Sequence, residues 1–393
     1  MTDMTDDTVF GAILAALFVL VVAAPSAASR HAWRFVAIDL GSLGGNFSEA
    51  TAVNSRGLVV GRSSIAGNAA YHAFAWSQGG GMTDLGTLGG GSRSWASAVT
   101  DDGAIAGYSY LPGDVAYHAF VWTRTNGLVD LGTLGGYASS TAAMNARGAV
   151  VGYSYLTDNQ TTHAFLWTQR QGMIDLGTLG GMFSTAYAIN DEGVVVGASA
   201  TAPHDIPHAF MWTRETGMVD LGTLGGYASW AHAVSDEGVV VGNSQTLAGE
   251  NHAFVWSRHS GMSDIGMTGL DSWAEKISSG RTAIGQGYTG AGTRHGFAWT
   301  RKSGQIDIGT LGGNSSYASA VNDLGMVVGG SWTAGNAAWH AFAWWLPSGM
   351  VALDNPGGGE SQATATSNDL VVGYSCHADQ FTCHATLWKP SSR

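Results

Sequence analysis

Residues 208–212 read His-Ala-Phe-Met-Trp, and this line decides the fold because it recurs along the whole chain. Successive copies lie 43 to 46 residues apart. A fixed period of this size indicates a repeat architecture with one supersecondary unit per copy. The eight copies, of which the last is the most degenerate, begin at His72, His118, His163, His208, His252, His295, His340 and His384.

Each copy contains four short runs bounded by Gly, Asn or Asp. In the copy around His208 they are Ser-Thr-Ala-Tyr-Ala-Ile-Asn (184–190), Val-Val-Val-Gly-Ala-Ser (194–199), His-Ala-Phe-Met-Trp-Thr (208–213) and Met-Val-Asp-Leu-Gly (218–222). Runs rich in β-branched and aromatic residues between such turns are typical of short strands. Their two faces are both largely apolar, which is expected where sheets stack on sheets. Four strands in about 45 residues predict a propeller blade, since a β-helix rung would be about half as long.

The two ends of the chain predict how the repeat closes. Residues 35–41, Phe-Val-Ala-Ile-Asp-Leu-Gly, form a fourth run that no copy precedes, and residues 384–388 form a third run that no fourth run follows. Pairing strand 35–40 with strand 384–388 would complete an eighth blade and remove an exposed sheet edge. We therefore predict an all-β, eight-bladed β-propeller over residues 33–390, with four antiparallel strands per blade. The Asp-Leu-Gly-like sites give the same count: Asp39, Asp84, Asp130, Asp175, Asp220, Asp264, Asp307 and Asp354.

The copies resemble the HAF repeat of bacterial extracellular repeat proteins. Seven of the eight copies carry the His, Phe and Trp together, and the resemblance covers residues 35–389. It implies a secreted or surface-associated protein. It implies little about activity, because that family has no well-defined biochemical role.

Composition and the N-terminal segment bear on location and partners. Charged residues make up 12% of the chain, the net charge is −12 and there is no basic stripe, which argues against nucleic acid and anionic membranes. Residues 9–24 are an apolar run, short for a membrane span and suited to a signal-peptide core, with small residues at 26–28 for cleavage. The acidic start at Asp3, Asp6 and Asp7 departs from that pattern, so an uncleaved anchor stays open. We expect residues 1–28 to direct export to the periplasm, cell surface or medium, and membrane contact only through an uncleaved segment.

Cys376 and Cys383 flank a six-residue loop in the last copy. In an exported protein this arrangement favours a disulfide across the hairpin. A histidine follows each cysteine (His377 and His384), so a metal site and free thiols remain alternatives, although the spacing fits no common zinc pattern. We expect no cofactor and no metal.

The repeat histidines are interpreted as structural. Equivalent side chains of neighbouring blades would lie far apart around the propeller and could not converge on one ion. A buried histidine needs a polar partner, which the repeat Asp or the Asn and Ser of the first hairpin could supply.

Function is therefore sought where the copies differ. The first position of the first run, near the expected mouth of a central channel, is aromatic in three successive copies. Aromatic faces beside polar groups suit sugar rings or peptide side chains, although these residues could also only fill gaps between blades. In chain order the position holds Glu49, Trp95, Ser140, Thr185, Trp230, Trp273, Tyr317 and Gln362.

The sixth copy departs most from the repeat. It carries Trp273, Glu275 and Lys276 where neighbouring copies have small or neutral residues, and Asp271 and Arg281 lie on either side of them. Charges in such a strand are costly unless they are paired or face a channel. The copy is either a ligand site built on Asp271, Trp273, Glu275 and Arg281 or a degenerate repeat.

Two classes of function follow. The favoured one is a non-catalytic binding scaffold, monomeric, that engages a glycan or an extracellular protein through its loop face. The alternative is a carbohydrate-active hydrolase or lyase, which needs two facing carboxylates. Glu49 and Glu360, near the expected mouth in adjacent blades, are one candidate pair, and Asp271 with Glu275 is another. Fold analogy alone is a weak warrant for either function.

Overall fold

The computed structural model describes residues 34–266, 270–379 and 381–391. Residues Trp33–Arg393 form one compact unit. The expected signal peptide or anchor at residues 1–28 lies outside the described residues. Apart from two short 3-10 turns, η1 (Ala66–Asn68) and η2 (Ala334–Asn336), the regular structure of the described chain is β-strand. None of it is a helix long and apolar enough to cross a membrane.

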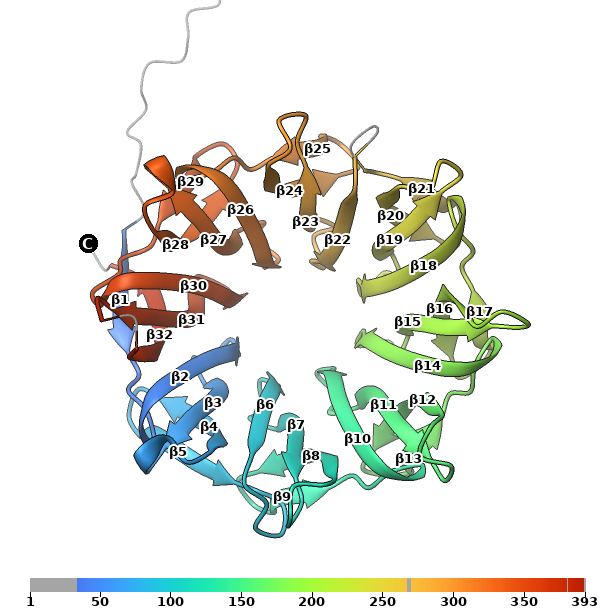
Figure 1. Ribbon diagram of the computed structural model, residues 1–393, viewed down its shortest axis with the longest axis horizontal. Coiled ribbons are helices and arrows are strands. Elements are labelled where there is room, and N and C mark those ends of the chain that lie inside the picture. Colours follow the sequence, from blue (N-terminus) through green and yellow to red (C-terminus); the bar gives the residue numbers. More distant parts are fainter. Residues whose placement is uncertain (1–33, 267–269, 380, 392–393) are drawn as a thin grey trace, which may run out of the picture. The chain divides into compact units, whose positions relative to one another are not determined.

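Each sequence copy forms a four-stranded antiparallel group, here called a unit and numbered one to eight along the chain. Figure 1 shows the first strand of every unit lying innermost, around a common centre. The first strands are β2 (Gly44–Val53), β6 (Ser94–Val99), β10 (Gly135–Met144), β14 (Gly180–Ile189), β18 (Gly225–Val234), β22 (Ser272–Ile277), β26 (Gly312–Val321) and β30 (Gly358–Ser367). The second strands are β3 (Val59–Ile65), β7 (Ile105–Tyr110), β11 (Val150–Leu156), β15 (Val195–Thr201), β19 (Val240–Thr246), β23 (Ala283–Tyr288), β27 (Val327–Thr333) and β31 (Leu370–His377).

The third and fourth strands lie progressively further from the centre. The third strands carry the His-Ala-Phe line and are β4 (Tyr71–Ser77), β8 (Tyr117–Thr123), β12 (Thr162–Thr168), β16 (Ile206–Thr213), β20 (Asn251–Ser257), β24 (Arg294–Thr300), β28 (Trp339–Trp345) and β32 (Cys383–Pro390). The fourth strands are β5 (Gly81–Gly86), β9 (Gly127–Asp130), β13 (Gly172–Asp175), β17 (Gly217–Asp220), β21 (Gly261–Asp264), β25 (Gly304–Asp307), β29 (Gly349–Ala352) and, from the start of the chain, β1 (Phe35–Asp39).

Strand pairing joins neighbouring units at two places in the described chain. The described strands form six sheets, four of four strands and two of eight. Each larger sheet arises because one parallel residue pair links the third strand of one unit to the first strand of the next, as Phe47 with Cys383 and Thr162 with Phe183. The four-stranded antiparallel group predicted for each copy is present within both larger sheets.

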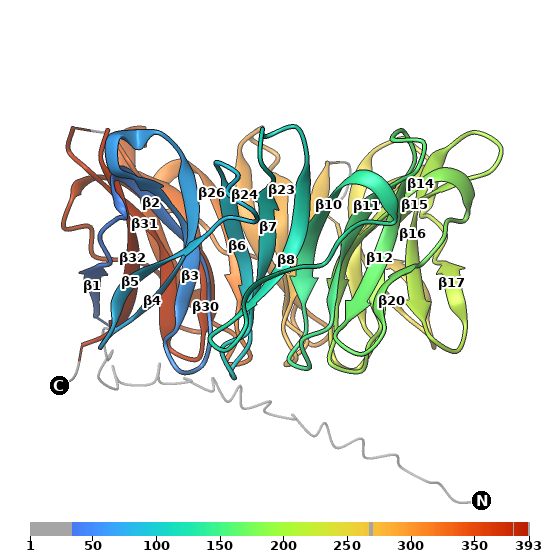
Figure 2. The same cartoon turned by 90° about the horizontal axis from the view of Figure 1, so that it is seen from below.

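The first and last strands of the described chain pair with each other. β1 runs antiparallel to β32, with Ile38 opposite Leu387 and Ala37 opposite Trp388, which is the pairing predicted from the sequence. β2 in turn contacts both β32 and β30. Figure 2 shows β1 on the outer side of β32.

The core lies between units rather than within them. Buried apolar residues of the described chain gather into eight clusters, each drawn from two successive units. In one of them Val195 and Phe210 pack against Val151 and Leu166 of the preceding unit. Within unit four the first and second strands also approach closely, since a Cβ at Gly197 would lie 2.0 Å from the carbonyl oxygen of Thr185 on β14, and this requires glycine in the second strand.

The repeat histidine is structural, as predicted. In seven units its Nδ1 lies 2.7–3.0 Å from a carboxylate oxygen of the aspartate on the fourth strand. The aspartate also accepts the backbone N–H of the glycine two residues later, as Asp84 does from Gly86. Unit seven differs, because Ala352 pairs with Phe342 where the aspartate should stand. Asp354 is two residues beyond the equivalent position, so counting it with the repeat aspartates was wrong.

A buried serine on each first strand links successive units. Ser229 accepts the backbone N–H of Ala209 at 2.8 Å and donates to the carbonyl oxygen of Gly222 at 2.6 Å. The link between the two ends of the chain is the same: Ser48 accepts the N–H of Ala385 at 2.7 Å and donates to the Gly41 oxygen at 2.6 Å.

Candidate functional site

Three successive units carry large polar or aromatic side chains on the innermost strand where the other units have small ones. Tyr187 of β14, His232 of β18 and Glu275 of β22 occupy equivalent positions. They lie two residues after the first position discussed above, at a register shift between the first and second strands of each unit. In the remaining units the position holds Thr51, Ser97, Ala142, Ser319 and Thr364.

These side chains border a cavity of about 730 Å³, here called the inner pocket. Its lining comes from units four to six. The innermost strands of these units, β14, β18 and β22, are neighbours in Figure 1. Two indole rings, three amides and three charged groups line it with His232 and Tyr187. The full lining is Tyr187, Trp230, His232, Asn243, Asn251, Trp273, Glu275, Lys276, Gln286 and Arg294.

Glu275 is fixed by two hydrogen bonds. The Tyr317 hydroxyl donates to Oε2 and the Gln286 amide donates to Oε1, both at 2.5 Å. Burial raises the pKa of Tyr317, and its bond to Glu275 adds to the rise, so the phenol stays protonated and remains a donor. Gln286 is 7% exposed, and its own Oε1 has no partner among the described residues. One buried acceptor in the wall of the pocket is thus left unpaired.

His232 is held as a neutral ring. It lies against Tyr187, with ring centroids 5.7 Å apart, and its Nε2 is 2.6 Å from the Asn243 amide oxygen. Because that oxygen can only accept, Nε2 carries the proton. Burial lowers the pKa of His232, and the bond to Asn243 and the nearby Glu275 only partly offset this.

Two cations face the pocket. Lys276 and Arg294 both line it, and the side chains of both are exposed to water. The surrounding protein lowers the pKa of Lys276, and the negative charge of Glu275 opposes that shift. With His232 neutral and Glu275 already accepting two hydrogen bonds, the pocket favours an anionic group on its ligand.

The structure brings together only part of the predicted site. Trp230, Trp273 and Glu275 meet in the inner pocket, and Tyr317 joins through its hydroxyl. Trp95 lies elsewhere and stacks on Tyr108 of the adjacent strand, with ring centroids 4.9 Å apart.

Asp271 and Arg281 do not line the inner pocket. The Asp271 carboxylate accepts the backbone N–H of Asn251 at 2.7 Å, which is a structural bond. Arg281 lies in the turn between β22 and β23 and pairs with Glu237 of the neighbouring turn. The predicted grouping of both residues with Trp273 and Glu275 is therefore corrected.

The structure gives Glu49 and Glu360, the predicted carboxylate pair, different surroundings. Glu49 forms an ion pair with Arg62 at 2.8 Å. Glu360 is exposed on β30. Burial raises the pKa of Tyr374, and the negative charges of Glu49 and Glu360 add to the rise, so both acids lie near that ring. Glu49 is bound to a guanidinium group and is poorly placed to act as a proton donor.

Sequence reasoning missed Tyr187 and His232. Both residues are departures from the repeat, which is the signal that identified Trp230 and Trp273. They lie two residues further along the strand, at a position that was not compared between copies. Charge drew attention to Glu275, whereas Tyr187 and His232 are neutral and were passed over.

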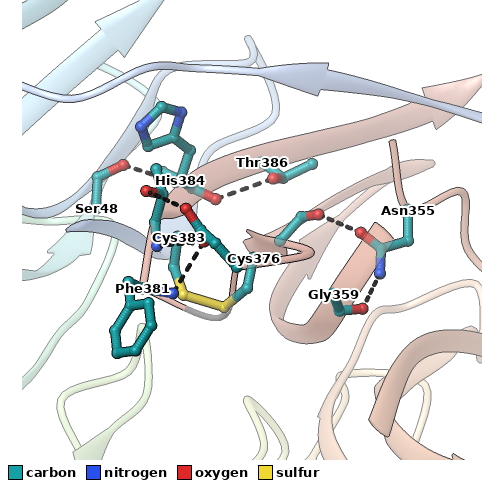
Figure 3. Close-up of a disulfide and its surroundings, with 12 residues drawn as sticks. Ser48, Asn355, Gly359, Cys376, Phe381, Cys383, His384 and Thr386 are labelled. Carbon is teal, nitrogen blue, oxygen red and sulfur yellow. Dashed lines mark hydrogen bonds between the residues drawn. A yellow bond between two sulfur atoms is a disulfide. The ribbon is translucent and has the colours of Figure 1, made fainter. Parts of the chain in front are cut away.

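The predicted disulfide is confirmed. Cys376 and Cys383 are bonded across β31 and β32, at directly opposite positions of the two strands (Figure 3). The bond lies in unit eight, which both ends of the described chain build.

The chain matches no protein-family model and no curated protein, so the resemblance to the HAF repeat stays a prediction. Solved structures do match. The β-propeller domain of the Trilobed protease from Pyrococcus furiosus aligns over 79% of this chain and 96% of its own, with a TM-score of 0.52 and 11% identity. The fold is a β-propeller.

Two further propellers come from whole peptidases. Porphyromonas gingivalis dipeptidyl peptidase 4 aligns over 86% of this chain and 56% of its own, with a TM-score of 0.57 and 11% identity. Pyrococcus horikoshii acylaminoacyl peptidase aligns over 86% and 59%, with a TM-score of 0.50 and 10% identity. This chain therefore spans just over half the length of each of these two enzymes.

These neighbours contradict the function inferred from the sequence. We expected a non-catalytic scaffold for carbohydrate or protein, or else a carbohydrate-active enzyme, and the matching propellers belong to peptidases. The error has a physical origin, because an aromatic ring beside a polar group suits an apolar peptide side chain as well as a sugar. Within the described residues, histidine ring nitrogens bond carboxylates, an amide or a backbone carbonyl, and none bonds a serine hydroxyl.

Proposed function

We propose that this chain is a peptidase-type propeller that binds a peptide in its inner pocket for cleavage elsewhere in a peptidase. The observation that carries the proposal is the lining of that pocket. Two indole rings, an unpaired buried amide oxygen and two basic side chains meet within about 730 Å³ on strands of units five and six. The similarity to propellers of peptidases supports the choice of ligand class.

The lining matches the chemistry of a peptide. The faces of Trp230 and Trp273 suit an apolar side chain, and the amides of Asn243, Asn251 and Gln286 suit backbone N–H and C=O groups. Lys276 and Arg294 suit a carboxylate, either a free C-terminus or an acidic side chain. We therefore propose a peptide with an apolar residue beside its C-terminal carboxylate.

We further propose eight blades in a ring completed by β1. The support comes from the pairing of Ile38 with Leu387 and from the Ser48–Ala385 bond, which repeats the link found between other units. The apolar cluster that joins Val372 and Leu387 to Val53 and Val59 adds to it. The disulfide supports export to an oxidising compartment, which we propose as the protein's location.

Titration calorimetry with the tripeptide Ala-Ala-Phe, as free acid and as C-terminal amide, tests the peptide proposal. We expect the free acid to bind and the amide to bind at least tenfold more weakly. Trp230→Ala should weaken binding by at least tenfold, because it removes one apolar wall. Trp95→Ala is the matched control, since Trp95 holds the equivalent position in unit two and lies outside the pocket.

Two results would refute the proposal. One is the absence of heat from either peptide at millimolar concentration. The other is an equal loss of affinity in Trp230→Ala and Trp95→Ala, which would place the binding site away from units four to six.

A further inference from the structure

Three adjacent strands of unit eight bring one potential metal ligand each to the same place. His377 comes from β31, His384 from β32 and Asp39 from β1, which is the strand order of the sheet. One ligand atom of each side chain lies within 4.8 Å of the other two. In the part of the chain that the structure describes, this is the one such group of three His, Cys, Asp or Glu side chains.

The register of the strands explains why the ligands meet. Cys376 is directly opposite Cys383, and the disulfide fixes both to one face of the sheet (Figure 3). His377 and His384 each follow a cysteine by one residue, so both point to the opposite face. They are diagonal neighbours, within reach of long side chains. Their ring centroids are 5.5 Å apart.

Asp39 completes the group from the other side of β32. Its two carboxylate oxygens each lie 3.0 Å from Nδ1 of His384. This is the repeat's structural His–Asp pair, here formed between residues 345 positions apart. The pair already holds the His384 ring and the Asp39 carboxylate side by side.

His377 is the addition that distinguishes unit eight. No structural role of the repeat calls for it, because other units form the His–Asp pair without a second histidine. The side chain is exposed, and its ring contacts His384. The equivalent position on other second strands holds aliphatic residues or threonine: Ile65, Leu156, Thr201, Thr246 and Thr333.

We propose that Asp39, His377 and His384 bind one divalent transition-metal ion of the zinc class. Imidazole nitrogen and carboxylate oxygen are the usual ligands of such ions, with metal–ligand distances of about 2.0–2.2 Å. Two ligand atoms at tetrahedral positions on one ion are then about 3.4 Å apart, so the group must close by side-chain rotation. The exposed ring of His377 can supply it, and water would occupy the remaining coordination positions.

Such an ion would connect the first strand of the described chain to the last two. Because binding requires β1 in place on β32, metal binding would stabilise the folded protein by mass action. The site is separate from the inner pocket, so it does not depend on the proposed peptide function.

The test uses the full chain with any affinity tag removed. Equilibrium dialysis against micromolar zinc with metal analysis gives the stoichiometry, and the visible spectrum of the cobalt-substituted protein reports the coordination. His377→Ala is the informative variant, because it leaves the His384–Asp39 pair intact and removes an exposed side chain. His259→Ala is the control, since His259 is also exposed and is not part of a ligand group.

We expect one zinc per chain, a Co²⁺ absorption band, and a thermal unfolding midpoint that zinc raises and EDTA restores. His377→Ala should lose the band and weaken zinc binding at least tenfold, while His259→Ala keeps both. The proposal is overturned if the native chain binds no zinc at these concentrations, or if His377→Ala binds it as the native chain does.

Discussion

Ser48→Ala tests the contact between the two ends of the described chain. The Ser48 side chain is fully buried, and its hydroxyl bonds the N–H of Ala385 and the carbonyl oxygen of Gly41. Alanine at this position removes both bonds and adds no bulk. The N–H of Ala385, also fully buried, is left without a partner, whereas Gly41 is partly exposed and can accept from water.

The expected cost follows from that difference. An unsatisfied buried backbone donor costs about 1–3 kcal/mol, and the rehydrated carbonyl adds little. Ser229→Ala removes the same pair of bonds, to Ala209 and Gly222, in the middle of the chain. If the junction of the chain ends is equivalent to the internal ones, the two variants should lose the same stability within about 1 kcal/mol.

Guanidinium unfolding followed by tryptophan fluorescence provides the measurement, with both variants and the native protein under identical conditions. A chain of many units can depart from two-state unfolding, so midpoints are compared before free energies. A lowered midpoint in Ser229→Ala together with an unchanged one in Ser48→Ala would refute the reasoning, because the ends would then contribute nothing to stability.

Three further outcomes are expected. Replacing both Cys376 and Cys383 by Ala should lower the free energy of unfolding by about 2–3 kcal/mol, the entropy of closing so short a loop, and reductant should produce a similar midpoint shift in the native chain only. Ala352→Asp should restore the missing partner of His340 and stabilise the folded protein by up to about 1 kcal/mol, seen as a slightly higher thermal midpoint. The neutral Ala352→Asn should raise the midpoint less. Burial alone would raise the pKa of Asp130, but hydrogen bonds from His118 and Gly132 outweigh it and hold the pKa below the ordinary value of 3.8. The stability that the Asp130 carboxylate contributes is therefore fully present above the ordinary pKa and is lost as pH falls through the pKa of the folded protein. Asp130→Asn should therefore flatten the loss of stability below about pH 4, and an unchanged acid limb in urea unfolding would count against the pair.

The fold could be predicted from the sequence because each copy of the repeat shows the same pattern of four strands. The pairing of Ile38 with Leu387 followed from one unmatched run at each end. The count of repeat aspartates was wrong in unit seven. Asp354 lies next to a leucine, as most of the repeat aspartates do, but it follows that leucine instead of preceding it. Only the pairing of Ala352 with Phe342 settles which residue occupies the repeat position.

The site was only partly predictable, because the sequence of one copy does not show which residues of neighbouring strands and units lie next to each other. Trp230, Trp273 and Glu275 were found as departures from the repeat. The bond of Asp271 to a backbone amide and the pairing of Arg281 with a neighbouring turn depend on which units are adjacent and which end of the strand each residue occupies. Likewise, only the sheet order places Asp39 beside His377.

Tyr187, His232 and Glu275 break an otherwise uniform set of small residues in one sector of the molecule. Rotational pseudo-symmetry would offer a ligand eight similar docking points, and these three substitutions remove that degeneracy. If the proposed peptide binds there, one ligand per protein molecule is the expected stoichiometry. At the corresponding positions Thr51 and Thr364 instead donate to the carbonyl oxygens of Ala96 and Ala50 in a neighbouring unit, at 2.7 and 2.6 Å, so a deep mutational scan should find that these two positions favour a hydroxyl side chain.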